Sequence, residues 1–177
     1  MDPTRVLSPA EQWFVARTRY FRQEIKIRDW LMERGVETFV PTLRSECKDP
    51  SGKRRYTEKP AAPNLVFLKT DKATACSFIT VEALPMQYVR DCATHRMMVV
   101  PEKAMSDFQR VFDLSKDRGG LVDQPLTLGE RVRITRGALR GVEGYITDLL
   151  GRVYVVVGLM DVLWAKAQVP RAWLEAV

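Results

Sequence analysis

Four side chains of this sequence carry chemistry suited to nucleophilic catalysis: the single histidine, His95, and three cysteines, Cys47, Cys76 and Cys92. A cysteine hydrolase needs its thiolate beside an imidazole that a third polar group orients. Cys92 lies three residues before His95, a spacing that matches no known nucleophile signature. A thiol hydrolase built on this pair is therefore the weakest of the functions considered, and we expect no enzyme.

The cysteines also lack the spacing of metal ligands, and the sequence has no glycine-rich phosphate-binding loop and no paired-carboxylate motif. We therefore expect neither a metal nor a cofactor. An odd, scattered set of cysteines favours a reducing compartment, and no apolar run is long enough to span a bilayer. The N-terminal residues lack the apolar stretch of a signal peptide. The sequence predicts a cytoplasmic protein without a membrane partner.

Composition allows a packed core and a polyanionic partner. The 177 residues are 46% hydrophobic, and 28 Lys and Arg against 22 Asp and Glu give a formal net charge of +6. This length fits one large domain or two small ones. The modest basic excess permits binding to nucleic acid without proving it.

Residues 11–113 mix strand and helix patterns. Runs of aromatic and β-branched residues predict strands over 13–19, 36–41, 63–69, 88–90 and 97–100. Apolar periodicity predicts helices over 20–34, over 72–79 and from Pro101 onward, and Gly35 ends the first of them. The polar segment 44–59 predicts a hairpin tip or a loose loop. We therefore expect a mixed unit of strands and helices.

The C-terminal segment reads as consecutive short strands. The polar stretch 115–125 contains a glycine pair and a proline and predicts a linker. Beyond it, Val132 and Ile134 alternate with polar residues, and three glycines, Gly137, Gly141 and Gly144, mark tight turns or close backbone approaches. Leu150-Gly151 predicts a hairpin turn, and the apolar runs after it predict more strands. We expect this segment to be β rather than helical.

These elements, in this order, resemble the NusG family. Its N-terminal (NGN) domain is similar to the start Trp13–Ala16, the exit Phe39–Pro41, the strand Pro63–Leu68 and the helix that follows Pro101. The glycine-punctuated segment resembles the family's KOW motif. The basic loop and the divergent KOW turn are similar to those of specialised paralogs of the RfaH kind, the antitermination factors of polysaccharide operons.

The resemblance implies an α+β fold with two domains. An N-terminal tail (1–10) would precede an NGN domain (11–113), an antiparallel sheet flanked by helices. A linker (114–126) would lead to a small SH3-like β-barrel, the KOW domain (127–177). The implied function is that of a transcription elongation factor, acting as a monomer, that binds RNA polymerase and promotes processive elongation or antitermination of a specific operon.

The resemblance also implies where RNA polymerase binds. The family's apolar groove receives the β′ clamp helices of the polymerase. The positions that match this groove are Pro63, Leu65, Phe67, Met105 and Phe108. An ordinary buried core is the alternative for these residues. The family's contact with the β-subunit gate loop falls on residues 76–78, where Ser77 is the remaining candidate.

Two basic groups are candidate contacts with non-template or upstream DNA. By resemblance, Arg19, Tyr20, Arg22 and Lys26 lie at the start of the first helix, near that strand. The cluster Lys53, Arg54 and Arg55 is the second group. Cations neutralise phosphates and a tyrosine can stack on an unpaired base. A solvated charged surface is the alternative for both groups.

The KOW segment would recruit a further partner. In the family a loop of this domain contacts ribosomal protein S10 or Rho, and the comparable turn here offers Leu159 and Met160. Both side chains could instead cap the barrel core. The alternative for the whole chain is a KOW-type RNA-binding or ribosome-associated protein that never contacts polymerase. The extent of the N-terminal segment favours the elongation factor.

Overall fold

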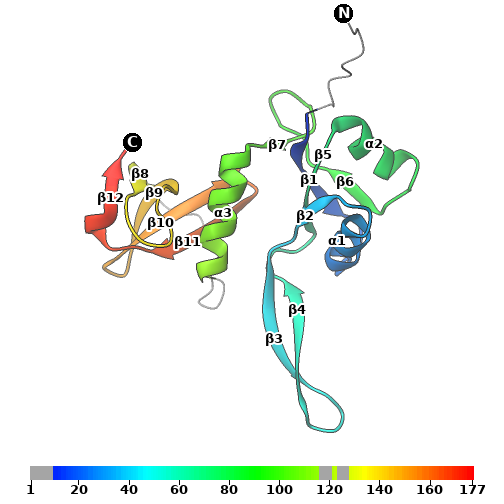
Figure 1. Cartoon of the computed structure of the whole chain (residues 1–177), viewed down its shortest axis with the longest axis horizontal. Coiled ribbons are helices and arrows are strands. Elements are labelled where there is room, and N and C mark those ends of the chain that lie inside the picture. The colour runs from blue at the N-terminus through cyan, green and yellow to red at the C-terminus, as the bar shows by residue number, and fades with distance from the viewer. Residues whose placement is uncertain (1–9, 116–120, 123–127) are drawn as a thin grey trace, which may run out of the picture. The chain divides into compact units, whose positions relative to one another are not determined.

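The computed structural model describes residues 10–115, 121–122 and 128–177 of the chain (Figure 1). Contacts between residues divide the chain into two compact units, which we describe separately. The first unit comprises Met1–Val40 and Ala62–Pro101, and the second comprises Pro41–Ala61 and Glu102–Val177. The combination of helices with antiparallel strands confirms the predicted α+β class.

The first unit is built on a five-stranded antiparallel sheet. Its strands are β1 (Gln12–Thr18), β2 (Glu37–Phe39), β5 (Leu65–Thr70), β6 (Met86–Tyr88) and β7 (Val99–Val100). They lie in the order β2-β5-β1-β6, and β7 also pairs with β1. The central strands β1 and β5 pair in a register that sets Val15 opposite Phe67. Both strands are rich in aromatic and branched residues, which pack well on a buried pleated surface.

Helices α1 (Glu24–Met32) and α2 (Lys72–Thr80) share a hydrophobic core with one face of this sheet. The buried side chains of this core are Phe14, Ala16, Ile27, Leu31, Val40, Val66, Leu68, Ala75, Phe78, Met86 and Tyr88. Asp71 caps the start of α2, and its carboxylate accepts hydrogen bonds from the backbone N–H groups of Ala73 and Thr74. A bond from the Thr74 hydroxyl is the main reason that the pKa of Asp71 is lowered.

Tyr88 ties strand β6 to helix α2. Its hydroxyl donates a hydrogen bond to the backbone oxygen of Ala75, 2.7 Å away, and its ring packs edge-on against Phe14 with 6.0 Å between centroids. Burial raises the pKa of the Tyr88 hydroxyl, so the neutral form that donates this bond persists at ordinary pH.

We expect Tyr88→Phe to lower the free energy of unfolding by about 1 kcal/mol, because one buried hydrogen bond is lost while the ring packing stays. Denaturant unfolding followed by tryptophan fluorescence measures the change. Tyr145→Phe is the matched control, because that ring is 37% exposed on a strand of the second unit. Wild-type stability in Tyr88→Phe would contradict the anchoring role.

Helix α1 begins at Glu24 rather than at Tyr20, so the predicted helix over 20–34 is too long at its start. Arg22 adopts φ = 64°, a left-handed conformation that interrupts a right-handed helix, and the chain turns here instead. The buried carboxylate of Glu24 accepts a hydrogen bond from the backbone N–H of Asn64 and anchors the helix start to the segment before β5. Gly35, at φ = 76°, follows the helix as predicted.

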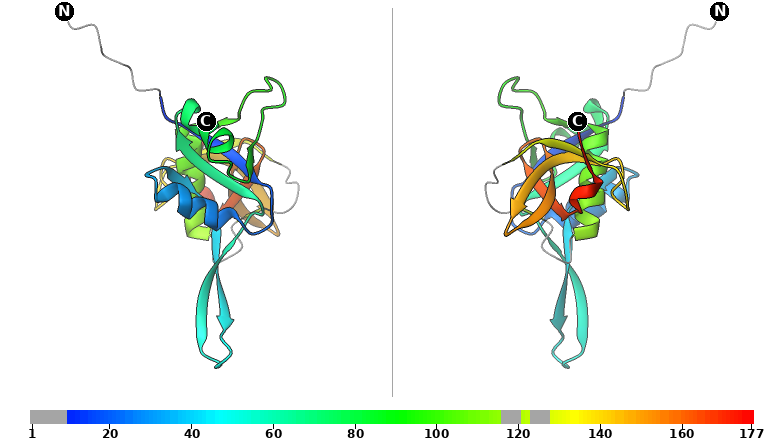
Figure 2. Two further views of the ribbon diagram at one scale, coloured as in Figure 1. Left: turned by 90° about the vertical axis from the view of Figure 1, so that its right-hand side faces the viewer. Right: turned by 90° about the vertical axis from the view of Figure 1, so that its left-hand side faces the viewer.

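A two-stranded hairpin, β3 (Thr42–Lys48) and β4 (Arg54–Pro60), forms the first part of the second unit. The polar segment 44–59 is therefore a regular hairpin and not a loose loop. Figure 2 shows the two strands, in cyan, running together to their turn. At that turn Asp49 accepts hydrogen bonds from the Ser51 hydroxyl and from the backbone N–H of Lys53, and these bonds, that of Ser51 first, lower the pKa of Asp49.

The rest of the described second unit combines helix α3 (Glu102–Ser115) with a second antiparallel sheet. Its strands are β8 (Arg131–Ile134), β9 (Glu143–Leu149), β10 (Arg152–Leu159), β11 (Leu163–Gln168) and β12 (Leu174–Ala176), with a short helix, η2 (Arg171–Trp173), before the last. They lie in the order β11-β10-β9-β8-β12, and among the described residues this sheet does not close into a barrel. The predicted β character of the segment is confirmed, as is the Leu150-Gly151 hairpin turn, with φ values of 52° and 74°.

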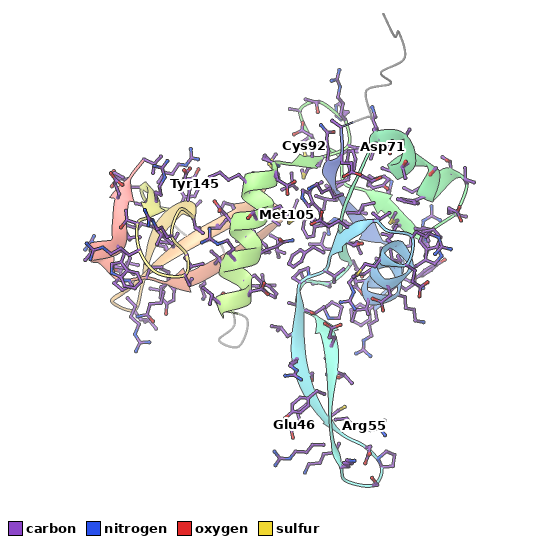
Figure 3. All side chains as sticks on the ribbon, viewed as in Figure 1. Glu46, Arg55, Asp71, Cys92, Met105 and Tyr145 are labelled. Atoms are coloured by element: carbon purple, nitrogen blue, oxygen red, sulfur yellow. The ribbon has the colours of Figure 1, made fainter. Side chains whose placement is uncertain are left out.

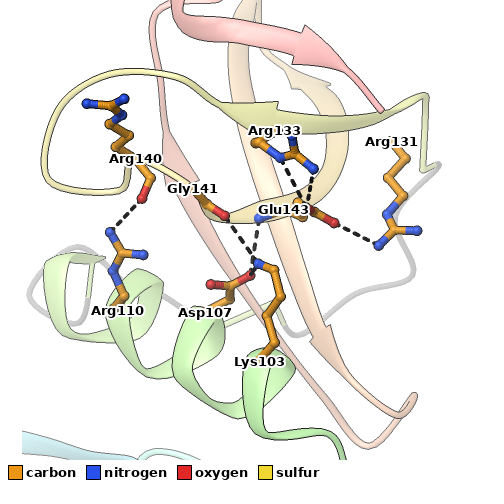
Figure 4. A network of polar contacts seen from close by, with 8 residues as sticks. All are labelled: Lys103, Asp107, Arg110, Arg131, Arg133, Arg140, Gly141 and Glu143. Atoms are coloured by element: carbon orange, nitrogen blue, oxygen red, sulfur yellow. Dashed lines mark hydrogen bonds and ion pairs between the residues drawn. The ribbon is translucent and has the colours of Figure 1, made fainter.

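Helix α3 packs against β10 and β11. Figure 4 shows the polar contacts that link α3 to the turn between β8 and β9. The buried carboxylate of Asp107 accepts hydrogen bonds from Lys103 Nζ at 2.6 Å and from the backbone N–H of Glu143 at 3.2 Å. The Arg110 guanidinium donates to two backbone oxygens of the turn, at 2.8 and 2.9 Å.

The backbone N–H of Glu143 contacts α3, whereas its side chain forms ion pairs with two arginines of β8. Its carboxylate accepts from Arg133 and Arg131, each at 2.9 Å. The hydrogen bond from Arg133 is the main cause that lowers the pKa of Glu143. The turn between β8 and β9 is thus fixed by ionic contacts on its strand side and by α3 on the other.

Contacts therefore group α3 with the C-terminal strands. Part of the predicted linker is also paired, because Leu121 forms a β-bridge with Ala165. Residues 1–9, 116–120 and 123–127 lie outside the described residues, and they include most of the predicted tail and linker and the first residue of the predicted KOW domain. The domain ranges 1–10, 11–113, 114–126 and 127–177 remain predictions.

Candidate functional site

The first unit has a second sheet face, opposite the one that α1 and α2 share. Because side chains alternate along a strand, the neighbours of Phe14, Ala16, Val66 and Leu68 point away from that core. Strand pairing adds Phe39, opposite Phe67, and Val100, opposite Trp13. The second sheet face thus consists of Trp13, Val15, Phe39, Leu65, Phe67 and Val100. All six side chains are apolar, and five of them, all but Phe39, are buried with exposed fractions of 4% or less.

Charged and polar residues border the second sheet face. Lys69 Nζ lies 3.6 Å from the Glu37 carboxylate on the neighbouring strand and 6.0 Å from the centre of the Trp13 ring. At the other end of β1, the exposed Arg17 stands between Leu65 and the exposed Gln87. An apolar centre with a polar rim is the usual anatomy of a protein-binding surface.

The residues predicted to bind polymerase fall in both units. Pro63 is exposed at the entry to β5, and Leu65 and Phe67 lie on the second sheet face. Met105, labelled in Figure 3, and Phe108 lie on α3 in the second unit. The exposed fractions are 4% for Leu65, 0% for Phe67, 1% for Met105 and 0% for Phe108, so a partner can contact these side chains only in a conformation that uncovers them. Their predicted role in polymerase binding stays a prediction.

An aromatic and basic turn follows β1. Tyr20 and Phe21 are 61% and 68% exposed, and the Arg22 guanidinium lies 5.2 Å from the centre of the Phe21 ring. The Arg19 backbone N–H donates to the oxygen of Pro85, and the Thr18 hydroxyl donates to the oxygen of Tyr20, so the turn is held at both sides. Exposed rings beside cations suit stacking on unpaired bases.

The structure places Arg19, Tyr20 and Arg22 in this turn, ahead of α1, and the exposed Lys26 within α1. Sequence reasoning missed Phe21, which is the more exposed of the two rings. The signal was present as consecutive aromatics between arginines.

If this turn stacks on unpaired bases, Tyr20→Ala together with Phe21→Ala should weaken binding of a short single-stranded DNA by about tenfold or more. Because both rings are largely exposed, the melting temperature should stay near that of the wild type. Fluorescence anisotropy of a labelled oligonucleotide measures the affinity. Val81→Ala, which trims another exposed apolar side chain of the first unit, is the control. Unchanged affinity in the double variant would exclude stacking at this turn.

Ion pairs engage two of the three cations in the predicted cluster Lys53, Arg54 and Arg55. Arg54 Nε lies 3.1 Å from the Glu46 carboxylate, and Arg55 Nε lies 3.4 Å from that of Asp49; Glu46 and Arg55 are labelled in Figure 3. Both arginine side chains are 72% exposed, and such surface pairs are weak enough to yield to a phosphate. Lys53 is exposed at the turn.

The hairpin also carries a cation–π pair, Arg44 and Tyr56, that sequence reasoning missed. The Arg44 guanidinium lies 4.9 Å from the centre of the Tyr56 ring, which is 60% exposed. The pairing of β3 with β4 brings these side chains to one face, together with Arg54. The hairpin therefore presents arginines beside an exposed ring, as a nucleic-acid contact requires.

Ser77 uses its hydroxyl within its own helix, where it donates to the backbone oxygen of Thr74 at 2.7 Å. A cavity of about 300 Å³ lies beside this part of α2, between Cys76 and the side chains of Met86 and Tyr88. In the C-terminal sheet, Leu159 is buried with no exposed surface, whereas Met160 is 42% exposed in the turn after β10. Of the pair predicted to bind a KOW partner, Met160 is the one that a partner can reach.

Cys92 and His95 lie in an exposed turn after β6. The turn is ordered by Asp91, whose carboxylate accepts hydrogen bonds from the backbone N–H groups of Thr94 and Ala93, with that of Thr94 the main cause of its lowered pKa. All three cysteines are free thiols. Within the described residues, no group of three or more His, Cys, Asp or Glu side chains could hold a metal ion. Over the same residues, no helix has the length and apolar character needed to cross a membrane.

The exposed aromatic and basic turn of this α+β unit has the side-chain chemistry of a nucleic-acid-binding surface. Residues 11–109, more than half of the chain, match the family model NusG, described as transcription termination factor NusG. The chain belongs to the NusG family, whose members are non-enzymatic factors that act on transcription elongation. No individual curated protein matches the chain.

Proposed function

We propose that this protein is a transcription elongation factor that binds RNA polymerase through its first unit and promotes processive elongation or antitermination of a specific operon. The observation that carries the proposal is the family match over residues 11–109, which spans the strands and helices of the first unit, the hairpin β3–β4 and the first part of α3. The cytoplasm, where the polymerase works, is the proposed location.

The polymerase contact would use the second sheet face. Helix-in-groove recognition depends on a few apolar anchors surrounded by a polar rim, and the β′ clamp helices are the proposed occupant. Phe67 and Leu65 would supply anchors, with Phe39 beside Phe67 at 6.0 Å between ring centroids. Because Leu65 and Phe67 are buried, binding requires a conformation that uncovers them. Met105 and Phe108 of α3 are proposed as further polymerase contacts, and Ser77 as a contact with the gate loop.

The nucleic-acid contact would use the aromatic and basic turn. Tyr20 and Phe21 can stack on unpaired non-template bases while Arg19, Arg22 and Lys26 neutralise phosphates. Lys53, Arg54 and Arg55 of the hairpin are proposed as a second contact, with upstream DNA. All these side chains are exposed to solvent, and Arg54 and Arg55 are in addition ion-paired.

The C-terminal sheet is proposed to be a KOW module of a specialised NusG paralog. Its five antiparallel strands support this assignment, as does Gly144, where β9 closely approaches the backbone of β10. Met160, exposed at the end of a hairpin, is the proposed contact with a recruited partner, ribosomal protein S10 or Rho.

A charge reversal on the rim tests polymerase binding without disturbing the core. We expect Arg17→Glu to weaken binding to purified RNA polymerase by about tenfold, because Arg17 borders the second sheet face and an interface tolerates like charge poorly. Lys72→Glu makes the same change at the exposed start of α2, on the other side of the sheet, and should bind as the wild type does. Biolayer interferometry measures both affinities. Equal binding by the two variants would contradict the assigned face. If the wild-type protein binds RNA but not polymerase, the alternative function, that of a KOW-type RNA-binding or ribosome-associated protein, is favoured.

A further inference from the structure

The second unit contains a cavity that the polymerase and DNA contacts do not use. Its volume is about 390 Å³, within the range of small-ligand sites. The end of α3 forms one wall, and the adjoining strands β10 and β11 form the other. The side chains that give the cavity its chemistry are Leu114, Ser115, Arg152, Tyr154, Lys166 and Gln168.

Strand register gathers the polar members of this set on one side of the sheet. Tyr154 of β10 lies directly opposite Gln168 of β11, and Lys166 is opposite Val156, two residues further along β10. Side chains two apart on a strand share a face, so Arg152, Tyr154, Lys166 and Gln168 point the same way. Lys166 Nζ lies 5.8 Å from the centre of the Tyr154 ring. The cavity wall is therefore an aromatic ring between two cations.

Among the described residues, no carboxylate forms an ion pair with either cation of this wall. The described ion pairs of the C-terminal sheet engage Arg131 and Arg133, which share Glu143, and none of them engages Arg152 or Lys166. Tyr154 and Lys166 are partly exposed, and Arg152 is exposed, so a ligand can reach all of them. An anion would meet two cations that no described carboxylate neutralises.

We propose that this cavity binds one nucleotide of a single-stranded nucleic acid. The base stacks on the Tyr154 ring, and the flanking phosphates pair with Arg152 and Lys166. Gln168 is the strand partner of Tyr154, and its carboxamide, which can both donate and accept, suits the edge of a base. Stacking is tolerant of sequence because every base has a π-face. Single-stranded RNA and single-stranded DNA share this chemistry, and a 2′-hydroxyl tells them apart.

Photo-crosslinking of the full chain tests the proposal. A short oligouridine RNA carrying 5-iodouridine, and its deoxy counterpart, are irradiated with the protein, and the crosslinked peptide is identified by mass spectrometry. We expect a crosslink to the β10 peptide that contains Tyr154, from the RNA, the DNA or both; the more efficient arm identifies the natural ligand.

Variants separate stacking and charge from folding. Arg152→Gln with Lys166→Gln should lower the yield of this crosslink by about tenfold at low salt, because both phosphate contacts are lost. Tyr154→Phe should keep it, and Tyr154→Leu should lose it while retaining an apolar side chain. Arg171→Gln, an exposed cation of the same unit outside the cavity, should behave as the wild type.

Crosslinks confined to the first unit or to the hairpin, or an undiminished β10 crosslink in the charge variant, would overturn the proposal. A crosslink that an acidic peptide but no oligonucleotide displaces would do so too. Polymerase binding by the charge variant should equal that of the wild type, so failure here is distinguishable from failure of the proposed polymerase contact.

Discussion

Gly144→Ala should destabilise the second unit by about 3 kcal/mol. A Cβ at this position would lie 2.5 Å from the backbone oxygen of Val156 and 2.8 Å from the side chain of Val155. Gly144 is buried at the start of β9, and strand β10 runs directly behind it. The obstacle includes backbone, so relief requires a shift of paired strands and not merely a rotamer change. Denaturant unfolding monitored by backbone amide signals of β9 and β10 measures the loss.

Gly141→Ala is the matched control for this result. Gly141 adopts φ = 86°, but nothing lies within 4 Å of its added Cβ, so its replacement meets backbone strain alone. We expect it to cost about 1 kcal/mol. Equal losses for the two variants would mean that β9 and β10 do not approach each other as described.

Asp107→Ala should release helix α3 from the C-terminal sheet. The carboxylate is the acceptor for the backbone N–H of Glu143, and its loss leaves that partly buried donor without a partner from α3. A hydrogen bond to a charged group contributes about 1.5–3 kcal/mol, so we expect a loss of about 2 kcal/mol. Hydrogen exchange of residues 102–115 should accelerate by more than tenfold in this variant.

Asp113→Ala is the control for the effect on α3. Asp113 lies on the same helix but is exposed, so its removal should change helix exchange much less than that of Asp107. Exchange of α3 that is unaffected by Asp107→Ala would contradict the pairing of α3 with the turn between β8 and β9. Loss of the ion pair between Lys103 and Asp107 would not by itself cause the expected change, because the Lys103 side chain is 58% exposed and such pairs are weak.

Local patterns were sufficient to predict most strands and the mixed fold. The aromatic and branched residues of β1 and β5 favour strands through local preferences, and Gly35 and Leu150-Gly151 adopt the positive φ values of turns; the folded chain keeps both features. The start of α1 was predicted too early because the left-handed Arg22 has no signature in the sequence. Arginine seldom adopts φ = 64°, and one of the hydrogen bonds that hold the turn involves Pro85, which is distant in the chain.

The partner of α3 could not be predicted from its pattern. The spacing of Met105, Phe108 and Phe112 correctly indicates an amphipathic helix, but an apolar stripe suits either sheet. Asp107 and Arg110 decide the contact with the C-terminal turn, through backbone groups that no sequence pattern marks.

The candidate site was predictable in its residue types but not in their accessibility. The alternation that brings Leu65 and Phe67 to one face holds, and both are buried. The ion pair between Arg54 and Glu46 could not be predicted from the sequence, because these side chains meet only when β3 pairs with β4 in the observed register. Leu159 was a candidate contact because it adjoins Met160, yet it ends a strand and points into the sheet core.

Site-specific photo-crosslinking tests the polymerase contact most directly. A p-benzoylphenylalanine replaces Gln87, which is exposed beside Arg17 at the border of the second sheet face, and the protein is irradiated on a purified elongation complex. The same group at Lys72, on the helix of the other face, is the control. We predict crosslinks from position 87 to the β′ clamp helices and few from position 72. A protein that joins the complex but crosslinks to β′ only from position 72 would contradict the assignment of the second sheet face.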